Sequence, residues 1–301
     1  MESAVVGTEV AGQLKLLHQI LPILKCVDCG FDRLKVEDGG PHLSCGECGR
    51  VYPLLENEIL YMIPKKGLPE PAIYKDPDYV KFMKCYEAEG LSMVFAEQSK
   101  MFHWIHHYGH KVVKRFSDEQ KSEGWSLDLG CGEGEHLNYV DNHSKVIALD
   151  ILAGPLKVVR KRFPRVFAIQ GDGTQLPFKD NVFDKIYSIH NLEHIYYLEE
   201  ALSEVRRTMS EACGRFYVVL PTEGSLIWNW GRKLIMCRRY SEKYGVDYLK
   251  VMKVAHCNTL RKVLSTCSGF FKVDRRNVFP LFFLPFININ MIYTITYLKK
   301  R

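Results

Sequence analysis

Ser126-Leu127-Asp128-Leu129-Gly130-Cys131-Gly132-Glu133-Gly134 is the stretch from which the fold can be predicted. The apolar run from Trp125 to Leu129 predicts a buried parallel strand, because such strands are covered on both faces. Three glycines follow at alternate positions, and residues 135–140 have the spacing of a helix. Glycine reaches backbone angles that other residues adopt only at a cost, and its missing Cβ lets a ligand approach the main chain. The stretch therefore predicts the nucleotide-binding corner of a doubly wound α/β sheet.

The next three strands of the predicted sheet agree with this. Residues 145–150 predict a second strand ending in Asp150, which lies twenty residues after Gly130, where a carboxylate that accepts from ribose hydroxyls is expected. Residues 166–169 predict a third strand that leads into Gly171-Asp172-Gly173, and Asp172 can accept a hydrogen bond from an adenine amino group. Residues 183–189 predict a fourth strand, which ends at His190-Asn191-Leu192-Glu193-His194.

These motifs, in this order and together with Phe183-Asp184, resemble those of class I S-adenosylmethionine-dependent methyltransferases. The resemblance covers residues 120–300 and is closest to the type 11 subgroup, which includes ubiquinone-pathway and sugar O-methyltransferases. It implies a Rossmann-like, doubly wound sheet of seven strands. The pattern Gly-x-Gly-x-Gly favours S-adenosylmethionine, whereas Gly-x-Gly-x-x-Gly is more typical of NAD enzymes.

The resemblance also implies which residues bind the cofactor. They come from the ends of the first three strands and from the turn after the fourth: Asp128, Leu129, Gly130, Cys131, Gly132, Gly134, Asp150, Ile151, Gly171, Asp172, Gly173 and His190. His190, Glu193 and His194 are the candidate catalytic residues, because they follow the fourth strand where the methyl group should lie. We expect His190 to be the base for a hydroxyl acceptor, whereas Glu193 and His194 can instead anchor the next helix.

Two Cys-x-x-Cys pairs predict a structural zinc site. Cys26-Val27-Asp28-Cys29-Gly30 and Cys45-Gly46-Glu47-Cys48-Gly49 both end in glycine, which permits the tight turn, and fifteen residues separate the pairs. Four thiolates suit tetrahedral zinc and leave no open position for catalysis; disulfides or inert thiols are the alternative. The unit resembles the small zinc-ribbon proteins that partner methyltransferases, here joined to one in the same chain.

The chain is expected to have three parts. Residues 1–63 hold an amphipathic N-terminal helix and the zinc ribbon, residues 64–121 hold a proline-rich linker and two covering helices, and residues 122–301 form the methyltransferase domain. One covering helix carries four histidines with i, i+4 pairs, but no carboxylate follows in register. We therefore expect it to cover the cofactor pocket with some histidines facing solvent, and not to bind a metal: His103, His106, His107 and His110.

Two segments are candidates for contact with the methyl acceptor. Residues 222–257 form an insertion after the fifth strand, and between Ser225 and Ser241 it has no acid but contains Trp228, Trp230, Arg232, Lys233, Arg238 and Arg239. Aromatic side chains can stack on a ring of the acceptor, and arginines can bind a phosphate on it. An amphipathic lid helix with a solvated basic face explains the same residues equally well. Residues 279–287 are uncharged and predict contact with a partner, a lipid or a second copy, unless they pack beneath the insertion.

Composition and charge argue against a dedicated nucleic-acid-binding domain, a membrane-spanning protein and a secreted protein. The net charge of +6 and pI of 8.7 are less basic than in a dedicated nucleic-acid domain, whose pI exceeds about 9. No segment reaches the roughly 18 uncharged apolar residues of a membrane span, and the first residues do not form a secretory signal. Ten cysteines without an export signal predict a reducing, cytoplasmic location.

The sequence thus predicts a methyltransferase that uses S-adenosylmethionine, contains structural zinc and methylates an oxygen of a small-molecule, glycan, lipid-linked or phosphate-linked acceptor. One alternative is an rRNA or tRNA base methyltransferase, resembling bacterial ribosomal-RNA guanine enzymes with a four-cysteine zinc unit; the absence of Asn/Asp-Pro-Pro-Tyr after the fourth strand weakens it. The other is a non-catalytic partner scaffold, against which Asp128, Asp150 and the glycines argue. Peripheral lipid contact and a homodimer are left open.

Overall fold

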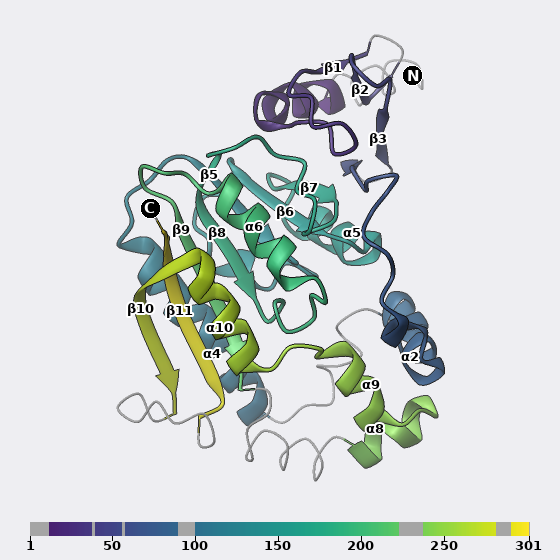
Figure 1. Cartoon of the computed structure of the whole chain (residues 1–301), viewed down its shortest axis with the longest axis vertical. Helices are drawn as coiled ribbons and strands as arrows, with labels where there is room; N and C mark the ends of the chain where they lie inside the picture. The colour runs from purple at the N-terminus through teal and green to yellow at the C-terminus, as the bar shows by residue number, and fades with distance from the viewer. Residues whose placement is uncertain are drawn as a thin grey trace.

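A computed structural model describes residues 12–37, 40–55, 58–89, 100–222, 237–280 and 290–300, with only the backbone for 87–89 and 100–102 (Figure 1). These residues form one eleven-stranded sheet with the order β1-β2-β3-β4-β7-β6-β5-β8-β9-β11-β10. The strands are β1 (Leu34–Val36), β2 (His42–Cys45), β3 (Val51–Leu55), β4 (Ile59–Tyr61), β5 (Trp125–Leu129), β6 (Val146–Asp150), β7 (Phe167–Gln170), β8 (Phe183–Ile189), β9 (Arg215–Pro221), β10 (Phe271–Phe279) and β11 (Ile292–Lys299).

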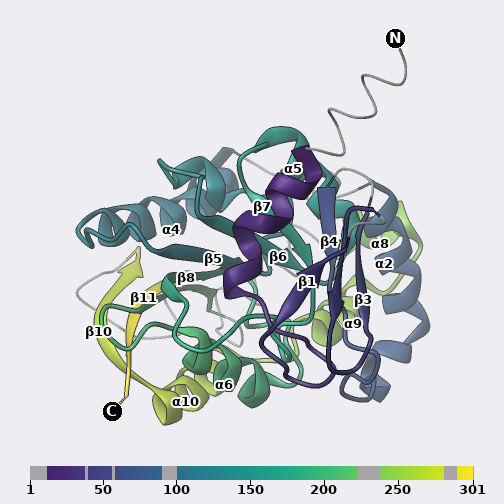
Figure 2. The same ribbon diagram turned by 90° about the horizontal axis from the view of Figure 1, so that it is seen from above.

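The seven strands from β7 to β10 in that order form the expected doubly wound sheet. Strands β7, β6, β5, β8 and β9 are parallel, whereas β11 is antiparallel to both β9 and β10. Helices α4 (Lys100–Asp118) and α5 (Ala153–Arg162) cover one face, and α6 (Leu198–Thr208) and α10 (Leu260–Phe270) cover the other (Figure 2). Buried side chains alternate between these faces along each strand, so both layers pack on the sheet.

The predicted number of seven strands is wrong, because the ribbon strands continue the same sheet. β4 pairs in parallel with β7, with Ile59 opposite Ala168, and β3 is antiparallel to β4. Ile59 and Leu60 are each 1% exposed, so this short strand is part of the core. An uncovered β7 would present unpaired backbone groups at the sheet edge, and β4 satisfies them. The positions of the domain boundaries stay predictions.

The local elements differ from expectation at one place that matters for the site. The segment after the glycine turn is a single 3-10 turn, η4 (His136–Tyr139), and not the predicted helix over 135–140. The two covering helices are present as α2 (Pro77–Glu89) and α4. Within the described part of the chain, no helix has the length and apolar character to cross a bilayer.

A small cap is formed by helices that come from two distant parts of the chain, one before β5 and two after β9. α2 packs against α8 (Cys237–Tyr244) and α9 (Tyr248–Ala255) around their own apolar cluster, which includes Phe82 and Tyr248. Nζ of Lys250 in α9 lies 2.6 Å from a carboxylate oxygen of Asp76, just before α2. Figure 1 shows the three helices together, beside the end of the sheet to which β8 points. The predicted covering helix α2 and the described part of the predicted insertion, residues 237–257, therefore form one structure.

Candidate functional site

The glycine turn after β5 has a backbone that other residues do not readily adopt. Gly130, Gly132 and Gly134 have φ values of 69°, 52° and 78°. A Cβ on Gly130 would lie 2.2 Å from the amide carbon of Asn191, so glycine is required there by space as well as by conformation. The turn thus exposes its main chain at the carboxyl end of the central strand, where ligands bind in doubly wound sheets.

Asp150, at the end of β6, holds this turn in place. Its Oδ2 accepts a hydrogen bond from the amide of Gly132 at 2.9 Å, and its Oδ1 accepts from the amide of Leu152 at 3.0 Å. Burial raises the pKa of Asp150, while these backbone donors oppose the rise. Each carboxylate oxygen has a second lone pair, so Asp150 can still accept from a ligand hydroxyl.

Asp128 is a buried carboxyl group at the end of β5. The residue is 2% exposed, and its Oδ2 has no hydrogen-bond partner. Burial, and then the negative charge of Asp150, raise the pKa of Asp128 to about 7. Two neighbouring carboxyl groups with incomplete pairing fit a ligand that carries positive charge.

The third turn follows β7 and lies beside the first two. The amide of Gly171 donates to the carbonyl of Asp150 at 3.0 Å, so the β6 and β7 ends are joined. Oδ1 of Asp172 accepts from the amide and the hydroxyl of Thr174 at 2.8 and 2.7 Å. A Cβ on Gly173 would lie 3.3 Å from the side chain of Leu129. The structure thus brings the residues predicted from three separate motifs to one sheet edge.

Not all predicted cofactor residues offer side chains to that edge. Leu129 is 1% exposed and Cys131 is 8% exposed, so both side chains belong to the core. Ile151, by contrast, is 56% exposed beside Asp150. An apolar side chain left this exposed at the end of a core strand can cover the face of a bound ring.

His190 occupies a strained turn after β8. Its φ is 52°, its amide donates to the carbonyl of Val219 at 3.0 Å, and its buried Nε2 has no hydrogen-bond partner. The next residue, Asn191, donates to the carbonyl of Leu129 at 3.0 Å and so ties this turn to the glycine turn. A non-glycine residue at positive φ is uncommon and concentrates at functional sites. Sequence reasoning did not select Asn191, although its position two residues after the fourth strand was a signal.

A cluster of imidazoles surrounds His190. The ring of His106 stacks on it at 4.8 Å, and His110 lies 5.0 Å further from His106, measured between ring centroids. Nδ1 of His110 is 3.2 Å from Nδ1 of His136, which sequence reasoning did not select. Burial lowers the pKa of His106 to about 4 and that of His136 to about 3, so these rings are neutral at physiological pH.

Gly109 explains how the helix brings these histidines to the sheet. A Cβ at this position would lie 2.5 Å from Cγ1 of Val219, so α4 approaches β9 more closely than another residue would allow. His110 is 2% exposed, so this histidine of α4 does not face solvent. That α4 covers the cofactor pocket stays a prediction. In the described chain, the histidines form no group with metal-ligand geometry.

Glu193 and His194 lie beside the cap and the start of α10. Nδ1 of His194 is 2.9 Å from the carbonyl of Ala255, and the carbonyl of Glu193 accepts from the amide of Asn258 at 3.1 Å. Asn258 in turn donates its side-chain amide to the carbonyl of Leu192 at 2.9 Å. These contacts join the turn after β8 to the segment that connects α9 with α10.

Tyr86 in α2 is a further residue of this region that the sequence did not reveal. Burial raises its pKa, and the next largest causes are the charges of Asp150 and Glu133. The cap therefore brings an aromatic side chain toward the acid expected to bind ribose. No local motif marks Tyr86, because its neighbours at the site come from β6 and from the glycine turn.

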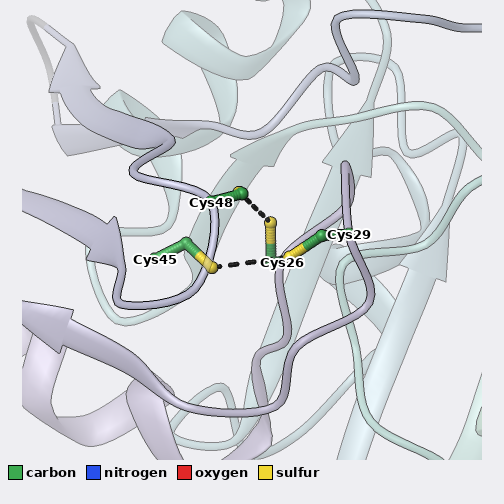
Figure 3. Close-up of side chains that lie close together, drawn as sticks. All are labelled: Cys26, Cys29, Cys45 and Cys48. Atoms are coloured by element: carbon green, nitrogen blue, oxygen red, sulfur yellow. Dashed lines mark hydrogen bonds between the residues drawn. The ribbon is translucent and has the colours of Figure 1, made fainter.

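The four predicted metal ligands come together in the ribbon (Figure 3). Their sulfur atoms all lie within 4.8 Å of one another, with Cys26 and Cys48 at 3.6 Å and Cys29 and Cys45 at 3.6 Å. Zinc–sulfur bonds of about 2.3 Å in a tetrahedron require sulfur separations of about 3.8 Å, so this donor set fits zinc.

The surroundings of these cysteines also suit a metal thiolate site. Gly30 and Gly49 have φ values of 77° and 68° and close the two turns. The hydroxyl of Tyr52 lies 2.9 Å from Sγ of Cys26 and can donate to it. Burial raises the pKa of Cys26, but this hydroxyl and backbone amides outweigh burial and lower it to about 7. The structure thus suggests the zinc site.

Some predicted acceptor residues cannot be placed. Trp228, Trp230, Arg232, Lys233 and residues 281–287 lie outside the described part of the chain. Arg238 lies at the start of α8, where its Nε is 2.9 Å from Glu242. Its side chain is 90% exposed, so this basic residue faces solvent at the edge of the cap.

Comparisons with known proteins give a family for the central part of the chain. Residues 127–216 match the family described as a methyltransferase domain. An uncharacterised protein of Methanocaldococcus jannaschii is 33% identical over 151 residues, which are 50% of this chain and 57% of that protein. The demethylmenaquinone methyltransferase of Renibacterium salmoninarum is 39% identical over 82 residues, or 27% of this chain and 35% of that enzyme.

Among solved structures, the N-methyltransferase NodS of Bradyrhizobium japonicum, in complex with S-adenosyl-L-homocysteine, resembles this fold with a TM-score of 0.51. The likeness covers 74% of this chain and 100% of NodS at 12% identity, and so concerns the fold alone. The α/β methyltransferase fold is thereby confirmed apart from the strand number. The domain match supports a class I methyltransferase domain with S-adenosylmethionine as its cofactor.

Proposed function

We propose that this chain is an S-adenosylmethionine-dependent methyltransferase that methylates an oxygen of a small-molecule, glycan, lipid-linked or phosphate-linked acceptor. The observation that carries the cofactor assignment is the glycine turn held by Asp150, with the buried carboxyl group of Asp128 beside it. S-adenosylmethionine carries a sulfonium and an ammonium group, and two incompletely paired carboxyl groups favour such a ligand. When bound, the cofactor would supply an electrophilic methyl group.

We assign His190 as the base that takes the proton from an acceptor hydroxyl. Burial, and then neighbouring His106, lower its pKa well below the ordinary value. The imidazole is therefore neutral at physiological pH, which is the form that accepts a proton, although the lowered pKa also makes it a weaker base. Its Nε2 has no hydrogen-bond partner, and its turn is tied to the glycine turn by Asn191. Glu193 and His194 anchor the segment before α10, and their assigned role is to hold this turn.

The acceptor is expected to enter between His190 and the cap of α2, α8 and α9. This cap is held together by a packed aromatic interior of its own, which includes Phe82 and Tyr240. The relative named for demethylmenaquinone favours an acceptor with apolar surface. The basic, acid-free stretch between Ser225 and Ser241 favours a phosphate or another anionic group on the acceptor.

Two measurements test this function. Calorimetry with S-adenosyl-L-homocysteine should show binding by the purified chain, and no binding would reject the cofactor and leave the scaffold alternative. Methyl incorporation should then be measured across hydroxylated small molecules, glycans, prenylated quinones and RNA. Transfer only to RNA would overturn the small-molecule proposal and support the RNA alternative.

His190→Gln tests the base separately. Loss of general base catalysis should lower the rate of O-methylation by about 10²–10⁴-fold while leaving the affinity for S-adenosyl-L-homocysteine nearly unchanged. His103→Gln, on the same helix as His106, is the matched imidazole control and should keep its activity. An unchanged rate in the His190 variant would remove it from the mechanism.

A further inference from the structure

Two side chains of the metal ribbon bind the backbone that follows the ribbon. Asp28 lies within the first Cys-x-x-Cys pair, and its Oδ1 accepts a hydrogen bond from the amide of Lys65 at 2.7 Å. Its Oδ2 lies 3.2 Å from Nε of Arg50, which follows the second pair. Nη2 of Arg50 donates to the carbonyl of Ile63 at 3.2 Å. Residues 63–65 are therefore attached to both metal-binding turns.

This ion pair is shielded from solvent. The side chains of Arg50 and Asp28 are 17% and 16% exposed, so their interaction is screened less than that of a surface pair. The guanidinium of Arg50 also lies 5.6 Å from the centre of the Tyr52 ring. Tyr52 is 0% exposed and contacts Sγ of Cys26, so the metal site and the ion pair share one packed environment.

The same backbone leads directly to the cofactor site. Tyr61 in β4 is opposite Gln170 in β7, and the amide of Met62 donates to the carbonyl of Gln170 at 2.8 Å. A Cβ on Gly67 would lie 3.9 Å from Oδ2 of Asp172, the carboxylate expected to bind the adenine amino group. Figure 1 shows this connection running from the ribbon to α2 on the β7 side of the sheet.

We propose that Asp28 and Arg50 are positioning residues of the cofactor site, because they hold residues 63–67 beside Asp172 and thereby link the metal ribbon to the adenosyl end of the pocket. This inference rests on the proposed function. If these residues are already ordered in the free protein, cofactor binding does not lose free energy in ordering them. Fixing the backbone of one residue corresponds to a factor of about ten in affinity, so releasing this connection should weaken cofactor binding measurably.

Calorimetric titration of the zinc-loaded full chain with S-adenosyl-L-homocysteine tests this proposal. Arg50→Met should raise Kd by about tenfold or more, because it removes both the ion pair and the bond to Ile63. Asp28→Asn should have a smaller effect, since its amide oxygen can still accept from Lys65. Arg215→Met is the matched control: it breaks an Arg–Asp pair with Asp274 on the opposite side of the sheet and should leave Kd unchanged.

Zinc content and amide hydrogen exchange distinguish positioning from loss of the ribbon. In Arg50→Met, we expect zinc to remain bound and exchange to become faster in residues 63–67 but not in β2. Wild-type affinity in a zinc-bound Arg50→Met chain would overturn the proposal, as would loss of zinc in that variant, since Arg50 would then serve the metal fold. If wild type itself does not bind S-adenosyl-L-homocysteine, the proposed function fails, and this inference falls with it.

Discussion

Asp128→Asn should stabilise the protein in a pH-dependent manner. The carboxyl group is 2% exposed with Oδ2 unpaired, and its pKa is raised to about 7 from an ordinary value of 3.8. Between these two pH values the folded chain keeps a proton that the unfolded chain has released. Stability is therefore lost as the pH rises through this interval, and the full cost of the ionised group is present above pH 7.

The size of the effect follows from the same two pKa values. At about 1.4 kcal/mol per pH unit, the full cost of ionising Asp128 in the folded chain is about 4 kcal/mol, of which about 2 kcal/mol is already present at pH 5.5. Asparagine does not titrate, and the cost of burying its amide is constant with pH. The difference in unfolding free energy between Asp128→Asn and wild type should therefore grow by about 2 kcal/mol from pH 5.5 to pH 8 in favour of the variant.

Urea unfolding of both proteins at pH 5.5, 6.5, 7.5 and 8.5 measures this difference. Other titrating groups, including the imidazole cluster and the metal thiolates, contribute equally to both chains and cancel. A constant difference for Asp128→Asn would refute the conclusion that Asp128 is a destabilising carboxylate. The variant should also bind S-adenosylmethionine more weakly, since a carboxylate retained at this cost is typical of a functional site.

Three further substitutions test separate parts of the structure. Gly130→Ala should abolish detectable binding of S-adenosyl-L-homocysteine in calorimetry, because its Cβ would overlap Asn191 at positive φ; normal binding would contradict the turn geometry. Cys48→Ser should lower zinc, measured by plasma mass spectrometry, from one atom per chain, and retained zinc would rule out four-cysteine ligation. Gly109→Ala should destabilise the protein by about 1–3 kcal/mol in thermal unfolding, despite alanine's higher helix propensity, because its Cβ would meet Val219; a stabilised variant would show that α4 can shift away.

The parts of this fold that could be predicted are those fixed by local sequence. The buried strand β8 has the predicted limits because seven residues of apolar pattern lie between clear breaks. The cysteine pairs carry their own turn glycines, so their convergence was also predictable. The pairing of β4 with β7 was not, because Ile59–Tyr61 is too short to show a period and its partner lies more than one hundred residues away.

In the candidate site, too, the residues marked by local sequence could be predicted, whereas contacts between distant segments could not. Asp128 and Asp150 lie at the carboxyl ends of their strands, and the topology of a parallel sheet brings such residues to one edge. The environment of His190 could not be derived, because it depends on how closely α4 approaches β9. That distance is set by the contact between Gly109 and Val219, two residues with no relation in the sequence.

Under the proposed function, acceptor choice should depend largely on residues outside the family match. The family match covers residues 127–216, which contain the cofactor turns and His190 but none of the three cap helices. Those helices pack around a cluster of their own, and Nδ1 of His194, in the turn after β8, lies 2.9 Å from the carbonyl oxygen of Ala255 in α9. Proteins that share the central sheet can therefore differ in acceptor by exchanging the cap. An acceptor screen on this chain tests the cap, whereas cofactor binding tests the sheet, and a result for one does not predict the other.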